Sequence, residues 1–248
     1  MSKTNVLGVI PARFASVRLP GKPLAKILGK PMIQWVWESA SRALDQVVVA
    51  TDDKRVADAV TAFGGVAMMT PASCQSGTDR MAHVAKKIDA AFYVNIQGDE
   101  PLMHPSTVRG AVALAIRENA IATPAMKLTE GFRDPNVVKV VVDRDNRALY
   151  FSRAPIPFPR DKELFCPPLK HLGLYVYPKA MLRAFVALNP TALERTEKLE
   201  QLRALVNGLP IFVSLTPHDS IGVDTKPDLL AVEKRLRASG GQSRRQGR

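Results

Sequence analysis

Three cationic side chains gather near the N-terminus in a segment that reads VIPARFASVRLPGKPL, where they are Arg13, Arg18 and Lys22. The residues just before them, 5–10, are apolar and branched, which predicts a buried strand of a parallel sheet. Prolines and a glycine interrupt the cationic stretch and restrict its backbone, so the charges are held in place. Ligands of open α/β sheets bind at the carboxyl ends of strands. The sequence therefore predicts an anion site that suits a polyphosphate.

Two well-known phosphate-binding loops do not fit this segment. The Gly21-Lys22 pair is followed by Pro23 where a P-loop has Ser or Thr, and no glycine precedes the pair at the P-loop spacing. The chain also has no G-x-G-x-x-G dinucleotide fingerprint. A solvated basic loop without a ligand remains the alternative interpretation.

Two aspartates far apart in the sequence are candidate ligands for a metal ion. Asp99 ends an apolar run in FYVNIQGDEP, and Asp224 lies in IGVDT just before an expected helix. Mg²⁺ is usually held by one or two carboxylates, while water and phosphate oxygens complete its shell. The pair therefore predicts a magnesium site close to the cationic loop. For Asp224 the alternative is a helix-capping role, which Asp often fills.

A polar turn, QSGTDR at residues 75–80, could contact a nucleotide through hydroxyl and backbone groups of Ser76 and Gly77. It precedes a helix that is expected to begin near Thr78. The alternative is a plain capped turn, with Ser76 or Thr78 as the N-cap and Asp79 in the first helical turn. The two interpretations are compatible.

The elements that must position these residues alternate in the first half of the chain. Strands followed by helices predict a mainly parallel sheet with helices on both faces. The expected strands are residues 46–51, 66–70 and 92–97, and the expected helices are residues 32–44, 54–63 and 78–88.

The second half departs from this alternation. Strand-like segments separated by polar or proline-rich breaks predict a small mixed lobe at about residues 130–210, and segment 155–168 should be an exposed loop. Apolar spacing predicts one continuous helix over residues 193–206. The other expected elements are strands at 137–142, 148–152, 172–177 and 211–215, and a closing helix at 226–236.

Length and composition fit a single enzyme domain. At 248 residues the chain suits one α/β domain, which we place at residues 1–238. The formal charge of +12 would suit nucleic acid or a membrane surface, but also a nucleoside triphosphate and an acidic sugar. Aromatic residues are few, which disfavours a nucleic-acid-binding surface. We expect residues 239–248 to form a basic, disordered tail.

The sequence also favours a cytoplasmic protein. No apolar stretch approaches the ~20 residues that a membrane span needs, and the N-terminus lacks the features of a signal peptide. We therefore expect no membrane partner. Cys74 and Cys166 are far apart and outside any zinc or redox motif, which predicts two free thiols.

The motif P-A-R-x-x-S-x-R-L-P-G-K-P-L, which contains the cationic loop, resembles the opening of the cytidylyltransferases that activate 3-deoxy-manno-octulosonate (Kdo) for lipopolysaccharide synthesis. That family also has Q-G-D-E and G-V-D-T elements like those around Asp99 and Asp224. Sialic-acid cytidylyltransferases share the P-A-R but continue with a Gly-Ser-Lys stretch. The resemblance extends from Val9 to about Glu233, with the motifs in family order.

The resemblance implies that CTP and Kdo react to give CMP-Kdo and pyrophosphate, in a homodimer whose mixed lobe serves sugar binding and dimerisation. It implies that Asp99 and Asp224 bind Mg²⁺, and that the catalytic cations are Arg13, Arg18 and Lys22. The residues that it implies for nucleotide binding are Pro11, Ala12, Arg13, Lys22, Gln75, Ser76, Gly77 and Asp99. Those that it implies for sugar binding are Arg80, Gln97, Arg153, His171, Tyr175, Glu200 and Gln201.

Each sugar-site residue also has a structural explanation. His171 and Tyr175 are four residues apart, which would place them on one face of a strand, yet His171 could be a core histidine. Arg153 could be an ion-pair partner, and Glu197 and Glu200 could belong to a solvated helix face. Another acidic sugar, such as an 8-amino Kdo analogue or a sialic acid, remains an alternative substrate. A basic nucleic-acid-binding protein is the alternative from a different class.

Overall fold

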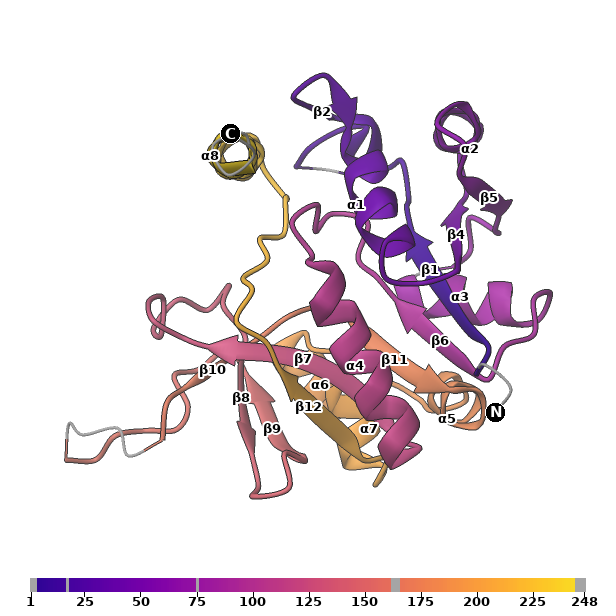
Figure 1. Cartoon of the computed structure of the whole chain (residues 1–248). Coiled ribbons are helices and arrows are strands. Elements are labelled where there is room, and N and C mark those ends of the chain that lie inside the picture. Colours follow the sequence, from indigo (N-terminus) through magenta and orange to yellow (C-terminus); the bar gives the residue numbers. More distant parts are fainter. Residues whose placement is uncertain (1–3, 17, 75, 162–165, 244–248) are drawn as a thin grey trace.

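A ten-stranded sheet forms the centre of the protein (Figure 1). The structure, a computed structural model, describes residues 4–16, 18–74, 76–161 and 166–243. The strands of the sheet are β1 (Val6–Pro11), β4 (Gln46–Thr51), β5 (Val66–Met69), β6 (Phe92–Asn95), β7 (Ile121–Lys127), β8 (Lys139–Val142), β9 (Ala148–Ser152), β10 (Leu169–His171), β11 (Tyr175–Pro178) and β12 (Ile211–Leu215). Their order is β5-β4-β1-β6-β11-β7-β10-β8-β9, and β12 pairs with β7 beside this path.

The first half of the sheet is parallel, as the alternating sequence predicts. β1 pairs in parallel with β4 and β6, and β4 pairs in parallel with β5. Successive side chains of β1 point to opposite faces, so Val9 shares a core cluster with Met81 while Ile10 shares another with Ile33. These partners belong to helices on the two faces. The helices here are α1 (Met32–Ser41), α2 (Lys54–Ala62) and α3 (Gly77–Ala85).

The second half continues the same sheet with mostly antiparallel pairs, and only β12 and β7 pair in parallel among its described strands. β11 runs antiparallel to β6 and so joins the two halves, while β10, β8 and β9 extend the sheet as antiparallel neighbours. The expected strand over residues 172–177 is shorter, because β10 and β11 are separate strands on either side of residues 172–174. The central strand β7 and the helices α4 (Pro105–Glu118) and α5 (Lys179–Val186) lie in segments that the sequence analysis left unassigned.

The continuous helix expected over residues 193–206 is wrong. The chain forms α6 (Ala192–Glu197) and α7 (Leu202–Val206), separated by a break at Lys198, whose backbone is left-handed with φ of 53°. A left-handed residue cannot continue a right-handed helix. The apolar spacing persists because Leu199, within the break, and Leu202, at the start of α7, are both buried. Glu200 and Gln201 therefore lie in the break and not on an exposed helix face.

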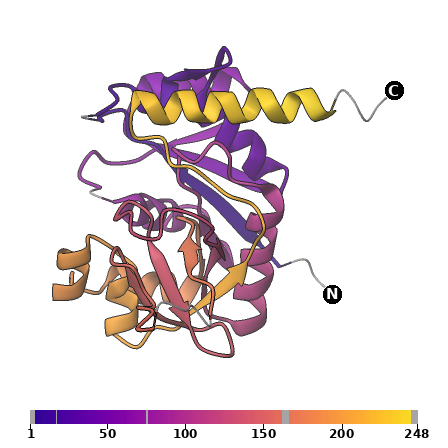
Figure 2. The same ribbon diagram turned by 90° about the vertical axis from the view of Figure 1, so that its left-hand side faces the viewer.

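The C-terminal helix α8 (Lys226–Ser243) extends past the expected boundary of a disordered tail, so residues 239–243 are helical. Residues 244–248 lie outside the described part of the chain. Figure 2 shows α8 running across one end of the molecule, next to the N-terminal segments. There it contributes Val232 to a small separate core with Ile27 and Met32. This packing attaches the end of the chain to the hairpin of β2 (Lys26–Ile27) and β3 (Lys30–Pro31), which follows the cationic loop.

Two further expectations concern loops and membranes. Within segment 155–168, the described residues form no helix or strand, and the Phe158 side chain is 80% exposed, which confirms an exposed loop. Within the described ranges, no helix has both the length and the apolar character needed to cross a membrane.

Candidate active site

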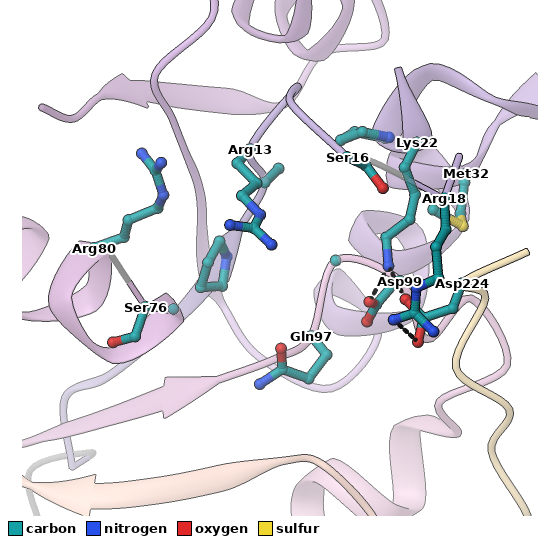
Figure 3. Close-up of a pocket in the computed structure, with 15 residues that line it drawn as sticks. Arg13, Ser16, Arg18, Lys22, Met32, Ser76, Arg80, Gln97, Asp99 and Asp224 are labelled. Carbon is teal, nitrogen blue, oxygen red and sulfur yellow. Dashed lines mark hydrogen bonds and ion pairs between the residues drawn. The ribbon is translucent and has the colours of Figure 1, made fainter. Parts of the chain in front are cut away.

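A cavity of about 460 Å³ opens at the carboxyl ends of β1 and β6, where the sequence predicts an anion site (Figure 3). It brings together segments from the two ends of the chain. The residues that line it are Pro11, Ala12, Arg13, Ser16, Arg18, Lys22, Pro23, Met32, Ser76, Gly77, Arg80, Gln97, Gly98, Asp99 and Asp224. Of these, Ser16, Pro23, Met32 and Gly98 were not assigned from the sequence, although each lies within or next to one of its motifs.

Lys22 joins the two candidate metal ligands. Its Nζ donates to a carboxylate oxygen of Asp99 and, at 2.9 Å, to Oδ1 of Asp224. Nη2 of Arg18 lies 3.0 Å from Oδ2 of the same Asp224. Burial acts to lower the pKa of Lys22, but Asp99 and Asp224 outweigh it and raise that pKa above its ordinary value. The structure thus confirms that the cationic loop and both aspartates meet at one point.

The backbone holds both aspartates in register. The N–H of Val223 donates to the carbonyl of Asp99 at 2.9 Å, which ties the two aspartate-bearing segments directly together. Gly98 precedes Asp99, and a Cβ at this position would lie 2.6 Å from the carbonyl oxygen of Pro11. Only glycine allows so close an approach of the two loops.

The helix-capping alternative for Asp224 is not what the structure shows. The start of α8 is capped by Thr225 and Asp228: the Asp228 carboxylate accepts from the N–H groups of Asp224 and Thr225, and the Thr225 hydroxyl accepts from the N–H of Asp228. Sequence reasoning missed Asp228, although Thr and Asp three residues apart are a recognised capping pattern. Because capping is done by these neighbours, the carboxylate of Asp224 is directed to Lys22 and Arg18.

The polar turn at residues 75–80 is both a cap and part of the cavity. Ser76 and Asp79 form a reciprocal capping box at the start of α3, with Asp79 N–H donating to the Ser76 hydroxyl at 3.1 Å. Ser76 and Gly77 line the cavity, so the start of α3 faces it. Gln75 lies outside the described residues.

Several of the sugar-site residues form a second polar group beside the sheet. The rings of His171 and Tyr175 lie 5.3 Å apart, although His171 ends β10 and Tyr175 begins β11, so the two do not share one strand. Glu200 accepts a 2.6 Å hydrogen bond from the hydroxyl of Thr78 on α3. Burial raises the pKa of Glu200 above its ordinary value, more than its hydrogen bonds lower it.

Some buried polar atoms of this group have no hydrogen-bond partner among the described residues. They include the Tyr175 hydroxyl and Nε2 of Gln201. Glu100, which the sequence analysis did not assign, is similar: its Oε2 has no partner and burial raises its pKa to about 7. Buried polar atoms are usually satisfied. Each of these atoms therefore keeps an unused hydrogen-bonding capacity inside the protein.

Arg153 lies outside the cavity. The guanidinium of Arg153 donates to the backbone carbonyls of Pro135 at 2.8 Å and Glu197 at 2.7 Å. The backbone N–H of Arg153 donates to the Glu197 carboxylate. Glu197 also accepts from the Ser152 hydroxyl. These contacts fasten the end of β9 to the end of α6. Gln97, by contrast, lines the cavity as expected.

A parallel α/β sheet with a cationic loop, a helix start and paired carboxylates at its carboxyl edge defines a protein of the nucleotidyltransferase class. The family described as cytidylyltransferase matches residues 7–213. A 3-deoxy-manno-octulosonate cytidylyltransferase of Syntrophotalea carbinolica is 52% identical, over 94% of this chain and 99% of its own. The enzyme of the same name from Geobacter sulfurreducens is 49% identical, over 94% and 100%. The chain therefore belongs to the family of 3-deoxy-manno-octulosonate cytidylyltransferases.

Solved structures agree with this assignment. A structure of CMP:2-keto-3-deoxy-manno-octonic acid synthetase complexed with CTP superposes with a TM-score of 0.91 at 41% identity, covering 95% of this chain and all of that one. A 4-diphosphocytidyl-2C-methyl-D-erythritol synthase from Anaerococcus prevotii is 16% identical with a TM-score of 0.63, over 94% of this chain and 99% of its own. The second likeness shows a shared fold.

We expect His171 to make the protein less stable in acid. Burial lowers the pKa of its ring to about 3, against roughly 6.5 in an unfolded chain. Protonation of the ring is therefore less favourable in the folded state than in the unfolded one. The stability due to the neutral ring is fully present above pH ~6.5. It is lost as the pH falls toward 3, by at most about 1.4 kcal/mol per pH unit. Denaturant unfolding followed from neutral to acidic pH measures this loss. It should be smaller in His171→Asn, and an unchanged pH slope in that variant would contradict the assignment.

Proposed function

We propose that the protein transfers the cytidylyl group of CTP to Kdo, giving CMP-Kdo and pyrophosphate for lipopolysaccharide synthesis. The observation that carries the proposal is the cavity in which Lys22 and Arg18 meet Asp99 and Asp224. It is supported by near-full-length relatives that bear the name of this activity and by the CTP complex of a relative. A polyphosphate needs cations to neutralise it, and this cavity contains them.

The chemistry is an in-line attack of the anomeric hydroxyl of the sugar on the α-phosphate of CTP, with pyrophosphate as the leaving group. Such transfers depend mainly on positioning and on neutralising the charge of the phosphates, so no covalent nucleophile is required. Arg13, Arg18 and Lys22 supply the positive charge for the triphosphate and the leaving pyrophosphate. In Figure 3, Arg13 lies between the turn at Ser76 and the cluster around Lys22, within the cavity.

We propose that Asp99 and Asp224 hold Mg²⁺. The donor set fits: two carboxylates converge on one cation, here the ammonium of Lys22, and two carboxylates are a usual protein contribution to a magnesium shell. Among the described residues no cluster of three or more His, Cys, Asp or Glu could hold a metal ion, which agrees with a site completed by phosphate. Held there, the ion would supply charge that neutralises phosphate oxygens and would lower the pKa of a hydroxyl bound to it.

The sugar would lie between Gln97 and the second polar group, which includes His171, Tyr175 and Glu200. Kdo carries a carboxylate and many hydroxyls, and the unpartnered Tyr175 hydroxyl and Gln201 amide are suited to hydroxyls. His171 is held neutral by burial and is hydrogen-bonded to the Thr123 hydroxyl at 2.9 Å, so it acts as a polar neighbour and not as a cation.

We propose that the protein acts in the cytoplasm as a homodimer. The family resemblance supports a dimer, and so do large apolar side chains that are exposed at the edge strands of the second half and in the adjoining loop, namely Leu149, Phe158 and Leu215. Light scattering on the purified protein should give twice the mass of one chain. A mass equal to that of one chain at micromolar concentration would contradict the dimer.

The first test of the function is nucleotide choice. Pyrophosphate release with Kdo should be much faster with CTP than with ATP or GTP, because the P-A-R loop and the QSGTDR turn resemble those of cytidylyltransferases. Replacing Kdo by its 8-amino analogue or by a sialic acid measures which acidic sugar is preferred. Equal rates with ATP would contradict the proposal, and a faster rate with another sugar would change the named substrate.

The second test separates a metal site from a helix cap. Asp99→Asn and Asp224→Asn should each lower turnover roughly a hundredfold or more, because each removes a proposed metal ligand. Melting temperatures should change little, since both side chains are partly exposed and ion pairs there contribute little to stability. Asp228→Ala is the comparison for a lost cap: it should lower stability by about 1 kcal/mol, a loss that Asp224→Asn should not show. The reverse result, in which Asp224→Asn melts early and remains active, would show that Asp224 is structural.

A further inference from the structure

Arg80 lines the cavity, but its charge is already paired with a carboxylate that does not belong to the lining. Its side chain is buried, and Nη2 lies 2.6 Å from a carboxylate oxygen of Asp52 while Nη1 donates to the hydroxyl of Thr70 at 2.6 Å. In the view of Figure 3, Arg80 stands apart from Lys22 and the aspartates, and no interaction joins it to another residue drawn. Two of its three nitrogens are thus committed to protein partners.

Those partners lie at the carboxyl ends of two strands. Asp52 follows β4 and Thr70 follows β5, and the N–H of Thr70 donates to the carbonyl of Thr51 at 2.8 Å. The strand ends therefore form one unit, to which Arg80 fastens the first turn of α3. An arginine–carboxylate bond that is both charged and buried is strong and directional. We name the set Asp52, Thr70 and Arg80 the α3 clamp.

The end of α3 that the clamp holds is the end that faces the cavity. Ser76 and Gly77 line the cavity, and a Cβ on Gly77 would lie 3.2 Å from the Pro11 side chain, so α3 already touches the end of β1. The first N–H groups of a helix lack partners within the helix and attract negative charge. A small displacement of this helix end would remove those groups from a bound nucleotide.

We propose that Asp52, through Arg80 and Thr70, is a positioning residue that fixes the start of α3 against the bound CTP. The inference rests on the proposed use of CTP, but it assigns Arg80 a different role from contact with the sugar acid. Asp52 has no place in the cavity lining and acts only through Arg80.

The test is CTP binding in the absence of any sugar, measured by calorimetry on the full-length protein. Asp52→Asn and Arg80→Met should each weaken CTP binding by about tenfold, because a misplacement of about 1 Å is enough to lose such contacts. The double variant should be no weaker than the weaker single variant, since both break one unit. Asp53→Asn is the matched control in the same loop: that carboxylate pairs with Arg55 instead, at 2.7 Å, and its loss should leave CTP affinity unchanged.

Two variants of Thr70 provide the test if the other clamp variants do not fold. If Asp52→Asn or Arg80→Met unfolds, Thr70→Val should weaken CTP binding while Thr70→Ser, which keeps the hydroxyl, should restore it. The proposal is overturned if folded clamp variants bind CTP like the wild type. It is also overturned if Arg80→Met alone is impaired and only its KM for Kdo rises, which is the result for a direct sugar contact. A wild-type protein that binds no CTP would instead refute the proposed function.

Discussion

Two carboxylates must be held facing one cation, and the rest of the structure serves this arrangement. Asp99 and Asp224 repel each other, and the repulsion grows as the site is shielded from water. In this structure the ammonium of Lys22 donates to both carboxylates and offsets their repulsion. The fold supplies what the charges alone cannot: a backbone hydrogen bond from Val223 to Asp99 and a glycine at position 98 that lets the two loops touch. Cation, carboxylates and close backbone approach together make the cavity.

The parts that could be predicted from the sequence are those encoded locally. Residues 5–10 predict β1 because branched apolar residues form buried strands, and the cationic loop and the Gly98–Asp99 turn are contiguous motifs. Their convergence follows from the rule that parallel strands end at one edge. Asp224 lines the cavity, as the sequence predicts. The helix start beside it is capped by Asp228, which the sequence analysis did not identify.

The parts that could not be predicted depend on contacts between distant segments. Lys198 adopts a left-handed backbone without being Gly or Asn, so nothing local marks the break between α6 and α7. That break directs Gln201 into the interior, where it is 6% exposed. The pairing of Arg80 with Asp52 joins residues 28 positions apart. The role of Arg153 likewise depends on carbonyl groups of other segments, and neither pairing has a sequence motif.

The attachment of α8 has a further consequence. Among the described side chains of α8, only Val232 is buried, and it packs in the small core with Ile27, Met32 and Val223. Elements held by few apolar contacts open at a lower free energy than the domain as a whole. If α8 detached while the sheet stayed folded, Asp224 would be held beside Lys22 only by the Val223–Asp99 backbone bond and by its own ion pairs. The competence of the site would then depend on a local equilibrium, and two molecules with the same global stability could differ in the fraction of time that they are able to act.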